Sequence, residues 1–306
     1  MKIFPTNFNP SSSSGPNSFT KGLLLNLSER HNIQTSSSFS DSDVEFAIIE
    51  SRLKKTLPRV VRLDGIYFNI DQDFSLLNST IKETYLSSDV AIFQSDFNKR
   101  LTESWFGSHK NGIVVKNGAN ISAISKVEKA DTSSTFGDRK IWMSASSWRP
   151  HKRLNSNIEY FVNNSDKDDI MLIAGSGVVK EDFRNYENLV NKRIFYLGHV
   201  SWESLISLYK SASTFIHLAF LDHCPNVVVD AAACGADIVC SSSGGTNEIE
   251  AASMTIVEDL DWNFKPIQLY NPPKLKFENK VKISKKFVYN LDKAADMYAK
   301  SIRSLV

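Results

Sequence analysis

The stretch LDHCPNVVVDAAACG, residues Leu221–Gly235, lies between two short apolar runs. These runs, STFIHLA before it and ADIVCSSSGG after it, have the length and the turn residues of buried strands. The stretch itself predicts a helix, because Pro225 suits a first helical position, where no backbone N–H partner is needed. Ala231–Ala233 and Gly235 would let this helix lie close to its sheet, so the segment predicts a strand, a helix and a strand in succession.

The same alternation runs through both halves of the chain. In the first half, helices are predicted at residues 18–30, 77–88 and 96–106, and strands at 2–7, 44–49, 59–63, 89–95 and 112–117. In the second half, helices are predicted after residue 153 and at 180–191, 201–212, 225–234 and 285–305, and strands at 140–146, 169–177, 193–198, 213–219 and 236–245. Repeated alternation of this kind predicts parallel sheets that are covered by helices on both faces.

A polar region, GANISAISKVEKADTSSTFGDR at residues 118–139, separates the two halves. It is rich in Ser and Thr and lacks a helix or strand period, so it predicts a linker. We therefore expect an α/β domain over residues 1–118, a linker over 119–139 and a second α/β domain over 140–285, with a cleft between the domains. In such sheets ligands bind beyond the carboxyl ends of the strands.

Composition agrees with a soluble protein of about two domains, since the chain has 306 residues, 42% hydrophobic and 23% charged. The net charge of +2 gives no indication of a nucleic-acid surface. Three cysteines without CxxC spacing argue against a disulfide framework or a zinc site and favour a reducing cytoplasm. The first residues, MKIFPTNFNPSSSSGP, lack the apolar core of a signal peptide, and no run approaches the length of a membrane span.

Two aspartates flank the start of the predicted helix at residues 225–234. Asp222 comes just before it and Asp230 five residues into it, while the unpaired N–H groups of the first turn form an anion site. Neither carboxylate can bind a phosphate, but each can accept hydrogen bonds from sugar hydroxyls on either side of one. The alternative, an ordinary helix-end charge at Asp222 and a capped or solvated Asp230, fits this stretch equally well when it is taken alone.

Groups that suit a phosphate also follow three other predicted strands. They are Gly175 and Gly177 in IAGSG, Arg149 and Lys152 in SSWRPHKRL, and Gly244, Gly245 and Thr246 in SSSGGTNEIE. Two cations could neutralise a pyrophosphate, and the glycines could form a nest of backbone donors. Each motif alone has an ordinary explanation, such as a turn or a solvated surface. Their occurrence at successive strand ends favours a phosphate site.

As a set, these motifs resemble glycosyltransferase family 4, whose members are retaining enzymes of the two-Rossmann (GT-B) fold. The resemblance covers Lys140–Glu250, and two further motifs within this range, FYLGHVSWESLISLYKSAS and GGTNEI, belong to it. It is looser in the first half, where Gly15 and Pro16 before a helix resemble the glycine loop of the family and VVRLDGIYFN resembles a strand and loop that face the cleft. The resemblance implies an α/β fold of two Rossmann-like domains, with the C-terminal helix, residues 286–306, crossing back to the first domain.

The resemblance also implies roles for individual residues. Asp222 and Asp230 stand where the family has two glutamates, of which the first lies near the transferred sugar and the second binds the ribose. Arg149 and Lys152 would neutralise the pyrophosphate, although Arg149 is displaced from the usual spacing, and Asp64 stands in place of a histidine on the acceptor side. The implied catalytic residues are Asp222, Arg149, Lys152 and Asp64. The implied donor-binding residues are Asp230, Gly15, Gly175, Gly177, His199, Val200, Pro225, Asn226, Gly245 and Thr246.

The expected reaction is retaining transfer from a nucleoside-diphosphate sugar to the hydroxyl of a sugar, a glycan, a lipid-linked molecule or another acceptor. No cofactor and no metal are expected, because fixed cations would stabilise the leaving nucleotide. Four Asp-x-Asp patterns are scattered along the chain and match no strand end of the metal-dependent kind. Peripheral contact with a membrane or with a partner protein stays open. The alternatives are a nucleotide-sugar epimerase, a viral-type transferase acting on modified DNA bases, and a nucleotide-sugar-binding protein that has lost turnover, as the change of both glutamates to aspartate would allow.

Overall fold

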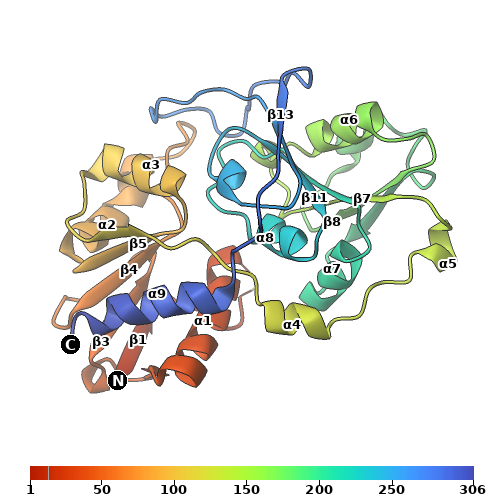
Figure 1. The fold of residues 1–306 in the computed structure, drawn as a ribbon. Helices are drawn as coiled ribbons and strands as arrows, with labels where there is room; N and C mark the ends of the chain where they lie inside the picture. Colours follow the sequence, from red (N-terminus) through yellow and green to blue (C-terminus); the bar gives the residue numbers. More distant parts are fainter. Residues whose placement is uncertain (13) are drawn as a thin grey trace.

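Two α/β domains form the protein, each built on its own sheet (Figure 1). The computed structural model describes residues 1–12 and 14–306, and Ser13, between the predicted strand at residues 2–7 and the predicted helix at 18–30, lies outside the described residues. The prediction of two Rossmann-like domains is confirmed, because both sheets are largely parallel and carry helices on their faces.

The first sheet has six parallel strands in the order β2-β1-β3-β4-β5-β6. Its strands are β1 (Lys2–Thr6), β2 (Gln34–Thr35), β3 (Val44–Ile48), β4 (Arg59–Leu63), β5 (Val90–Phe93) and β6 (Gly112–Val114). Its helices are α1 (Gly15–His31), α2 (Phe74–Ser87) and α3 (Asp96–Phe106). Every residue of β3, β4 and β5 is buried, which is why these strands form continuous, mostly apolar runs in the sequence.

The second sheet has seven strands in the order β13-β12-β11-β10-β7-β8-β9, with only β13 antiparallel to its neighbour among the described strands. Its strands are β7 (Ile141–Ala145), β8 (Ile170–Ala174), β9 (Ile194–Gly198), β10 (Thr214–His217), β11 (Asp237–Ser241), β12 (Met254–Val257) and β13 (Lys280–Ile283). Its helices are α6 (Leu154–Asn164), α7 (Trp202–Tyr209) and α8 (Asn226–Ala233). The strand order reverses between β7 and β10, so the loops after these two strands flank a crevice.

The C-terminal helix, α9 (Leu291–Arg303), returns to the first domain, as the resemblance implied (Figure 1). Its apolar stripe, which includes Ala295, Tyr298 and Ile302, packs in one core cluster with residues of β1 and α1. The helix begins later than predicted, since residues 285–290 are not helical and Val288 is exposed. Asn290 causes the late start, because its side chain caps the helix by accepting a hydrogen bond from the Asp292 N–H.

Two segments differ from the sequence-based expectation. Residues 180–191 were predicted as a helix but form only the 3-10 turn η3 (Lys180–Phe183) and further turns. Their apolar residues Phe183, Tyr186 and Leu189 recur every third position, and successive turns place all three against the core of the second domain. The predicted linker contains two short helices, α4 (Ile121–Lys126) and α5 (Ser133–Phe136), of which α4 buries Ile124 in that domain.

Candidate functional site

Lys152 and Asp222 meet at the crevice where the strand order of the second sheet reverses. Lys152 ends η2 (Pro150–Lys152) in the loop after β7, and Asp222 lies in the loop after β10. The Lys152 Nζ atom is 2.5 Å from Asp222 Oδ2, and both side chains are mostly buried. Lys152 was expected at the pyrophosphate and Asp222 near the transferred sugar, and the structure brings the two side chains into direct contact.

Three further groups hold Asp222 in place, two through its carboxylate and one through its main-chain carbonyl oxygen. His217 Nε2 lies 2.9 Å from Oδ2, and the backbone N–H of His223 donates to Oδ1 at 3.0 Å. The Gly245 N–H donates to the Asp222 carbonyl oxygen at 2.7 Å. Burial would raise the pKa of Asp222, but the charge of Lys152 and the hydrogen bond from His217 hold this pKa well below its ordinary value. Asp222 is therefore a fixed carboxylate anion at neutral pH.

Three histidines surround this pair as neutral rings. Burial lowers the pKa of His217, of His151 to about 3 and of His223 to about 4, and the charge of Lys152 lowers all three further. The Nδ1 atom of each ring is buried without a hydrogen-bond partner among the described residues. Buried polar atoms without partners are uncommon in native proteins and often mark functional sites. The sequence left open whether His217, near the end of its predicted strand, lies in the core or in the cleft, and it marked His223 only by its nearness to Asp222.

The helix α8 begins at the boundary between the domains. Its first residue is Asn226, one residue later than predicted, and Pro225 is the N-cap instead of the first helical residue. No side chain of residues 1–12 or 14–306 caps the helix, so its first N–H groups stay open to a ligand. Asn226 contacts the first domain twice, because its Nδ2 donates to the Gly15 carbonyl oxygen at 3.1 Å and its Oδ1 accepts from Asn117 Nδ2 at 2.8 Å. Gly15, Pro225 and Asn226 are therefore brought together.

Asp230 lies on the same helix, just over one turn beyond Asn226. Its Oδ2 accepts a hydrogen bond from Trp202 Nε1 at 3.1 Å, which is its one side-chain partner within the described residues. Burial raises the pKa of Asp230 to about 6, and the Trp202 bond offsets only part of this effect. Asp222 and Asp230 thus differ in state, since the first is anchored by charges and the second is destabilised by burial.

Gly175 and Gly177 serve close packing of the loops after β7 and β8. Both have positive φ angles, of 112° and 91°. A Cβ atom on Gly175 would lie 1.8 Å from the Ser146 carbonyl oxygen, and one on Gly177 would lie 2.4 Å from that of Trp148. The Gly175 N–H is already bonded to the Gly198 carbonyl oxygen. These glycines are explained by packing between the two loops, and their contact with a donor stays a prediction.

The loop after β11 joins the two domains. A Cβ atom on Gly245 would lie 2.7 Å from Ser95 Oγ of the first domain, and Thr246 is buried beside it in η4 (Thr246–Glu248). The Glu248 carboxylate accepts hydrogen bonds from the N–H groups of Asp96 at 2.8 Å and Phe97 at 2.7 Å. A residue of the second domain thus caps α3 of the first. Glu248 was not predicted as a site residue, although it belongs to the GGTNEI motif.

The remaining predicted residues lie in different surroundings. Arg149, in the loop after β7, and His199, in the loop after β9, are exposed, and Val200 packs on the core of the second domain. Asp64 is not a free acid, because it is paired with Arg62, which is fully buried. Burial raises the pKa of Asp64 and the Arg62 charge opposes this rise.

A separate cavity of about 890 Å³ lies between α3 and the segment after β12. Its lining includes Arg100, Asn247, Asp261 and Trp262, and it also includes Gly244, one of the glycines that the sequence predicted to suit a phosphate. Within residues 1–12 and 14–306, no cluster of three or more His, Cys, Asp or Glu side chains is arranged to hold a metal ion. No helix in the described part of the chain is long and apolar enough to cross a bilayer.

Comparison with known proteins supports this fold. Residues 125–257, which include Lys152, Asp222 and Asp230, match the family model described as "Glycosyl transferases group 1". No curated protein matches the chain by sequence.

Solved structures match over nearly the whole chain. HepE from Anabaena, solved with UDP and glucose, superposes with a TM-score of 0.69 at 13% identity, over 100% of both chains. Sucrose-phosphate synthase from Thermosynechococcus elongatus gives a TM-score of 0.71 at 12% identity, over 100% of this chain and 99% of that one. AviGT4, a glycosyltransferase involved in avilamycin A biosynthesis, gives 0.62 at 15% identity, over 100% and 98%.

Replacing Asp230 by Asn should stabilise the protein in a pH-dependent way. The pKa of Asp230 is raised to about 6, so the folded state favours the protonated acid and loses stability as the pH rises from about 4 to above 6. The amide mimics the protonated acid, so Asp230→Asn should gain at most about 3 kcal/mol over wild type at pH 7.5 and little at pH 4. Urea unfolding at both pH values measures this gap. Asp237→Asn, on the exposed start of β11, is the control. If the difference in unfolding free energy between Asp230→Asn and wild type is the same at both pH values, burial does not raise the pKa of Asp230.

Proposed function

We propose that this protein is a retaining glycosyltransferase that moves a sugar from a nucleoside-diphosphate sugar to an acceptor hydroxyl. One observation carries the proposal: a buried lysine–aspartate pair at the strand-order reversal of the second sheet, beside the open start of α8. A helix start and a lysine together suit a diphosphate, and a carboxylate beside them suits a sugar. The match of residues 125–257 to group 1 glycosyltransferases and the shared fold support the same assignment.

The donor would lie across the start of α8. Its pyrophosphate would take the N–H groups of the first turn together with Lys152 and the exposed Arg149. The ribose hydroxyls would donate to Asp230, one turn further along, and the transferred sugar would lie near Asp222. In this arrangement Lys152 is shared between the phosphate and Asp222, so donor binding lengthens the ion pair. UDP-glucose is the first donor to test, because HepE was also solved with UDP-glucose.

Transfer with retention would proceed on one face of the sugar. The bond between the anomeric carbon and the phosphate oxygen breaks, and the acceptor oxygen bonds to the same face of that carbon. The acceptor proton passes to the departing phosphate oxygen. Lys152 and Arg149 would stabilise the negative charge on the leaving nucleotide, and Asp222 would stabilise the positive charge that develops on the sugar. Asp64, paired with Arg62, would contribute to the acceptor side as a fixed dipole.

We propose that the acceptor is a hydroxyl of a sugar, a glycan or a lipid-linked molecule. We also propose that the protein acts in the cytoplasm. We also propose that no metal takes part, because Lys152, Arg149 and α8 supply positive charge at the place where a metal would act. The chemistry needs no cofactor beyond the donor.

Asp222→Asn and Asp230→Asn should change different steps. Asp230→Asn loses a charged acceptor for the ribose, so UDP should bind about tenfold to a hundredfold more weakly, as follows from about 1.5–3 kcal/mol for such a bond. Asp222→Asn frees Lys152 for the phosphate, so UDP should bind as well or better, while turnover falls at least tenfold because sugar charge is no longer stabilised. Calorimetry with UDP and release of UDP from UDP-glucose, with and without candidate acceptors, measure both effects.

Asp237→Asn is the matched control for both variants, since it removes an exposed carboxylate of the same domain. The same nucleotide-release assay separates a transferase from an epimerase and from a binding protein without turnover. If Asp230→Asn binds UDP as tightly as wild type and Asp222→Asn turns over normally, the two aspartates are ordinary charges near a helix end and the proposal fails for them.

Turnover should survive the removal of divalent metal. Fixed cations carry the leaving-group charge in this proposal, so EDTA should lower the rate of UDP release by less than about twofold, well short of the loss expected when a Lewis acid is removed. The assay compares rates in EDTA with rates in added Mn²⁺ or Mg²⁺. Complete loss in EDTA, restored by either ion, would overturn the metal-free mechanism.

A further inference from the structure

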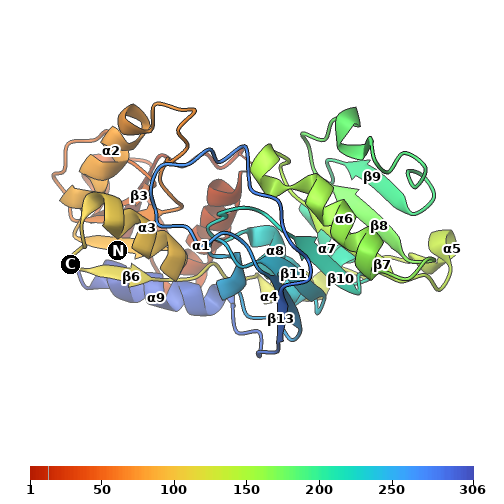
Figure 2. The same cartoon turned by 90° about the horizontal axis from the view of Figure 1, so that it is seen from above.

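Residues 259–273, here called the bridging loop, leave the second domain after β12 and return to it before β13. Arg153 closes the neck of this loop, because its guanidinium bonds to Asp259 at 2.6 and 3.1 Å and to the Pro273 carbonyl oxygen at 2.8 Å. The side chains of Arg153 and Asp259 are 3% and 1% exposed. Figures 1 and 2 show the loop as a blue trace that extends from the second domain toward α3.

The tip of the bridging loop is bonded to the first domain. Ile267 pairs with the segment after β4, since its N–H donates to the Phe68 carbonyl oxygen and its own carbonyl oxygen accepts from Ile70, both at 3.1 Å. The indole N–H of Trp105, in α3, donates to the Phe264 carbonyl oxygen at 2.7 Å. The loop is therefore fixed at its neck by one domain and at its tip by the other.

Aromatic rings connect the bridging loop to the site. The Trp262 ring lies 4.6 Å from that of Phe68 and 6.2 Å from that of Phe97. These two rings in turn lie 6.2 and 5.4 Å from the imidazole of His223, whose backbone N–H holds Asp222. A Cβ atom on Gly65 would lie only 2.6 Å from His223 Nε2, so the ring fills a slot with no spare room.

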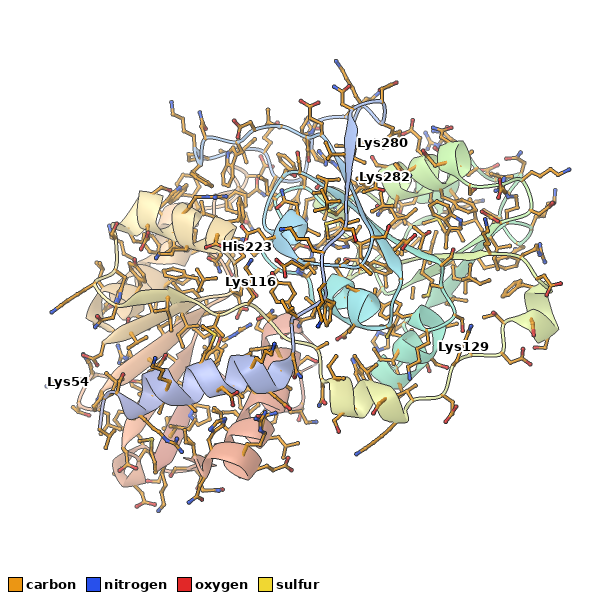
Figure 3. The ribbon with its side chains drawn as sticks, in the orientation of Figure 1. Lys54, Lys116, Lys129, His223, Lys280 and Lys282 are labelled. Atoms are coloured by element: carbon orange, nitrogen blue, oxygen red, sulfur yellow. The ribbon has the colours of Figure 1, made fainter. Side chains whose placement is uncertain are left out.

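We propose that Trp262 in the bridging loop is a positioning residue, which holds His223 in its slot in the first domain and thereby fixes Asp222 at the crevice. Only the effect on turnover, which acts through Asp222, rests on the proposed function. The placement of His223 stands on the packing alone. Figure 3 shows His223 at the boundary between the domains.

The length of the loop argues for such a role. Loops of about 15 residues without secondary structure are uncommon in compact domains and are usually functional, because ordering them costs backbone entropy. The domains are also joined by Glu248 at α3 and by Asn226 at Gly15. Loosening the bridging loop therefore releases His223 without separating the domains.

The test compares Trp262→Ala with Trp262→Phe and with Phe39→Ala. Phe39 is a matched control, because it also packs ring against ring, on Phe4 at 5.5 Å, in the first domain and outside the aromatic group around His223. The pKa of His223, which burial lowers to about 4, is followed by NMR of its ring protons, assigned with His223→Gln. The charged groups that act on this ring are Asp222 and Lys152 of its own domain, while Gly65, Phe68 and Phe97 of the first domain present no charge to it.

In Trp262→Ala the pKa of His223 should rise by at least about one unit toward its ordinary value, because water reaches the ring. Turnover of UDP-glucose should fall at least tenfold, while UDP affinity changes less than about threefold, since the donor contacts remain. Trp262→Phe should restore both the pKa and the turnover, and Phe39→Ala should change neither. If Trp262→Ala does not fold, Trp105→Phe, which removes the hydrogen bond to the Phe264 carbonyl oxygen, should raise the His223 pKa in the same direction.

A Trp262→Ala protein whose His223 pKa and turnover match those of Phe39→Ala would overturn the proposal. If wild type turns over no nucleotide sugar, the NMR titration still decides whether the bridging loop holds His223. Failure of the proposed function and failure of the positioning role are therefore distinguishable.

Discussion

The ion pair between Lys152 and Asp222 is the constraint on which the rest of the site depends. Its side chains are only 16% and 14% exposed, so each charge needs the other and needs further hydrogen bonds. His217 and the His223 N–H supply these bonds to the Asp222 carboxylate, and the Gly245 N–H holds the Asp222 main chain. Buried pairs of this kind seldom add stability over apolar packing, so a role in binding explains this one better than a role in folding does.

The same pair fixes how the two domains meet. Because Asp222 is held, His223 projects into the slot beside Gly65, and Gly245 packs against both the His223 carbonyl oxygen and Ser95. The Glu248 carboxylate then reaches the start of α3, where a negative charge is favourable. The crevice is therefore lined by groups whose positions depend on one another, which suits a site that stabilises charge without rearranging.

Much of the fold could be predicted from the sequence, because strands buried on both faces are continuous apolar runs and helices alternate with them. The positions of Lys152 and Asp222 could also be predicted, since both lie in loops that follow such strands. Residues 180–191 were predicted wrongly as a helix, because an apolar spacing of three was read as a helical period. The contacts of Glu248 and of the bridging loop could not be predicted, since their partners are distant in sequence. His217 lies only five residues from its partner Asp222, but the sequence left open whether its ring lies in the core or in the cleft. The pairing of Asp64 with Arg62 was missed although the two are close in sequence, because burial makes it effective and no periodicity reveals it.

A crystal structure of the protein with UDP tests the central claim most directly. We expect the diphosphate within hydrogen-bond distance of Lys152 and of the first N–H groups of α8, and the ribose hydroxyls at Asp230. The Lys152–Asp222 contact should then be longer than 2.5 Å. UDP bound elsewhere, for example in the cavity beside α3, with the ion pair unchanged, would contradict the account.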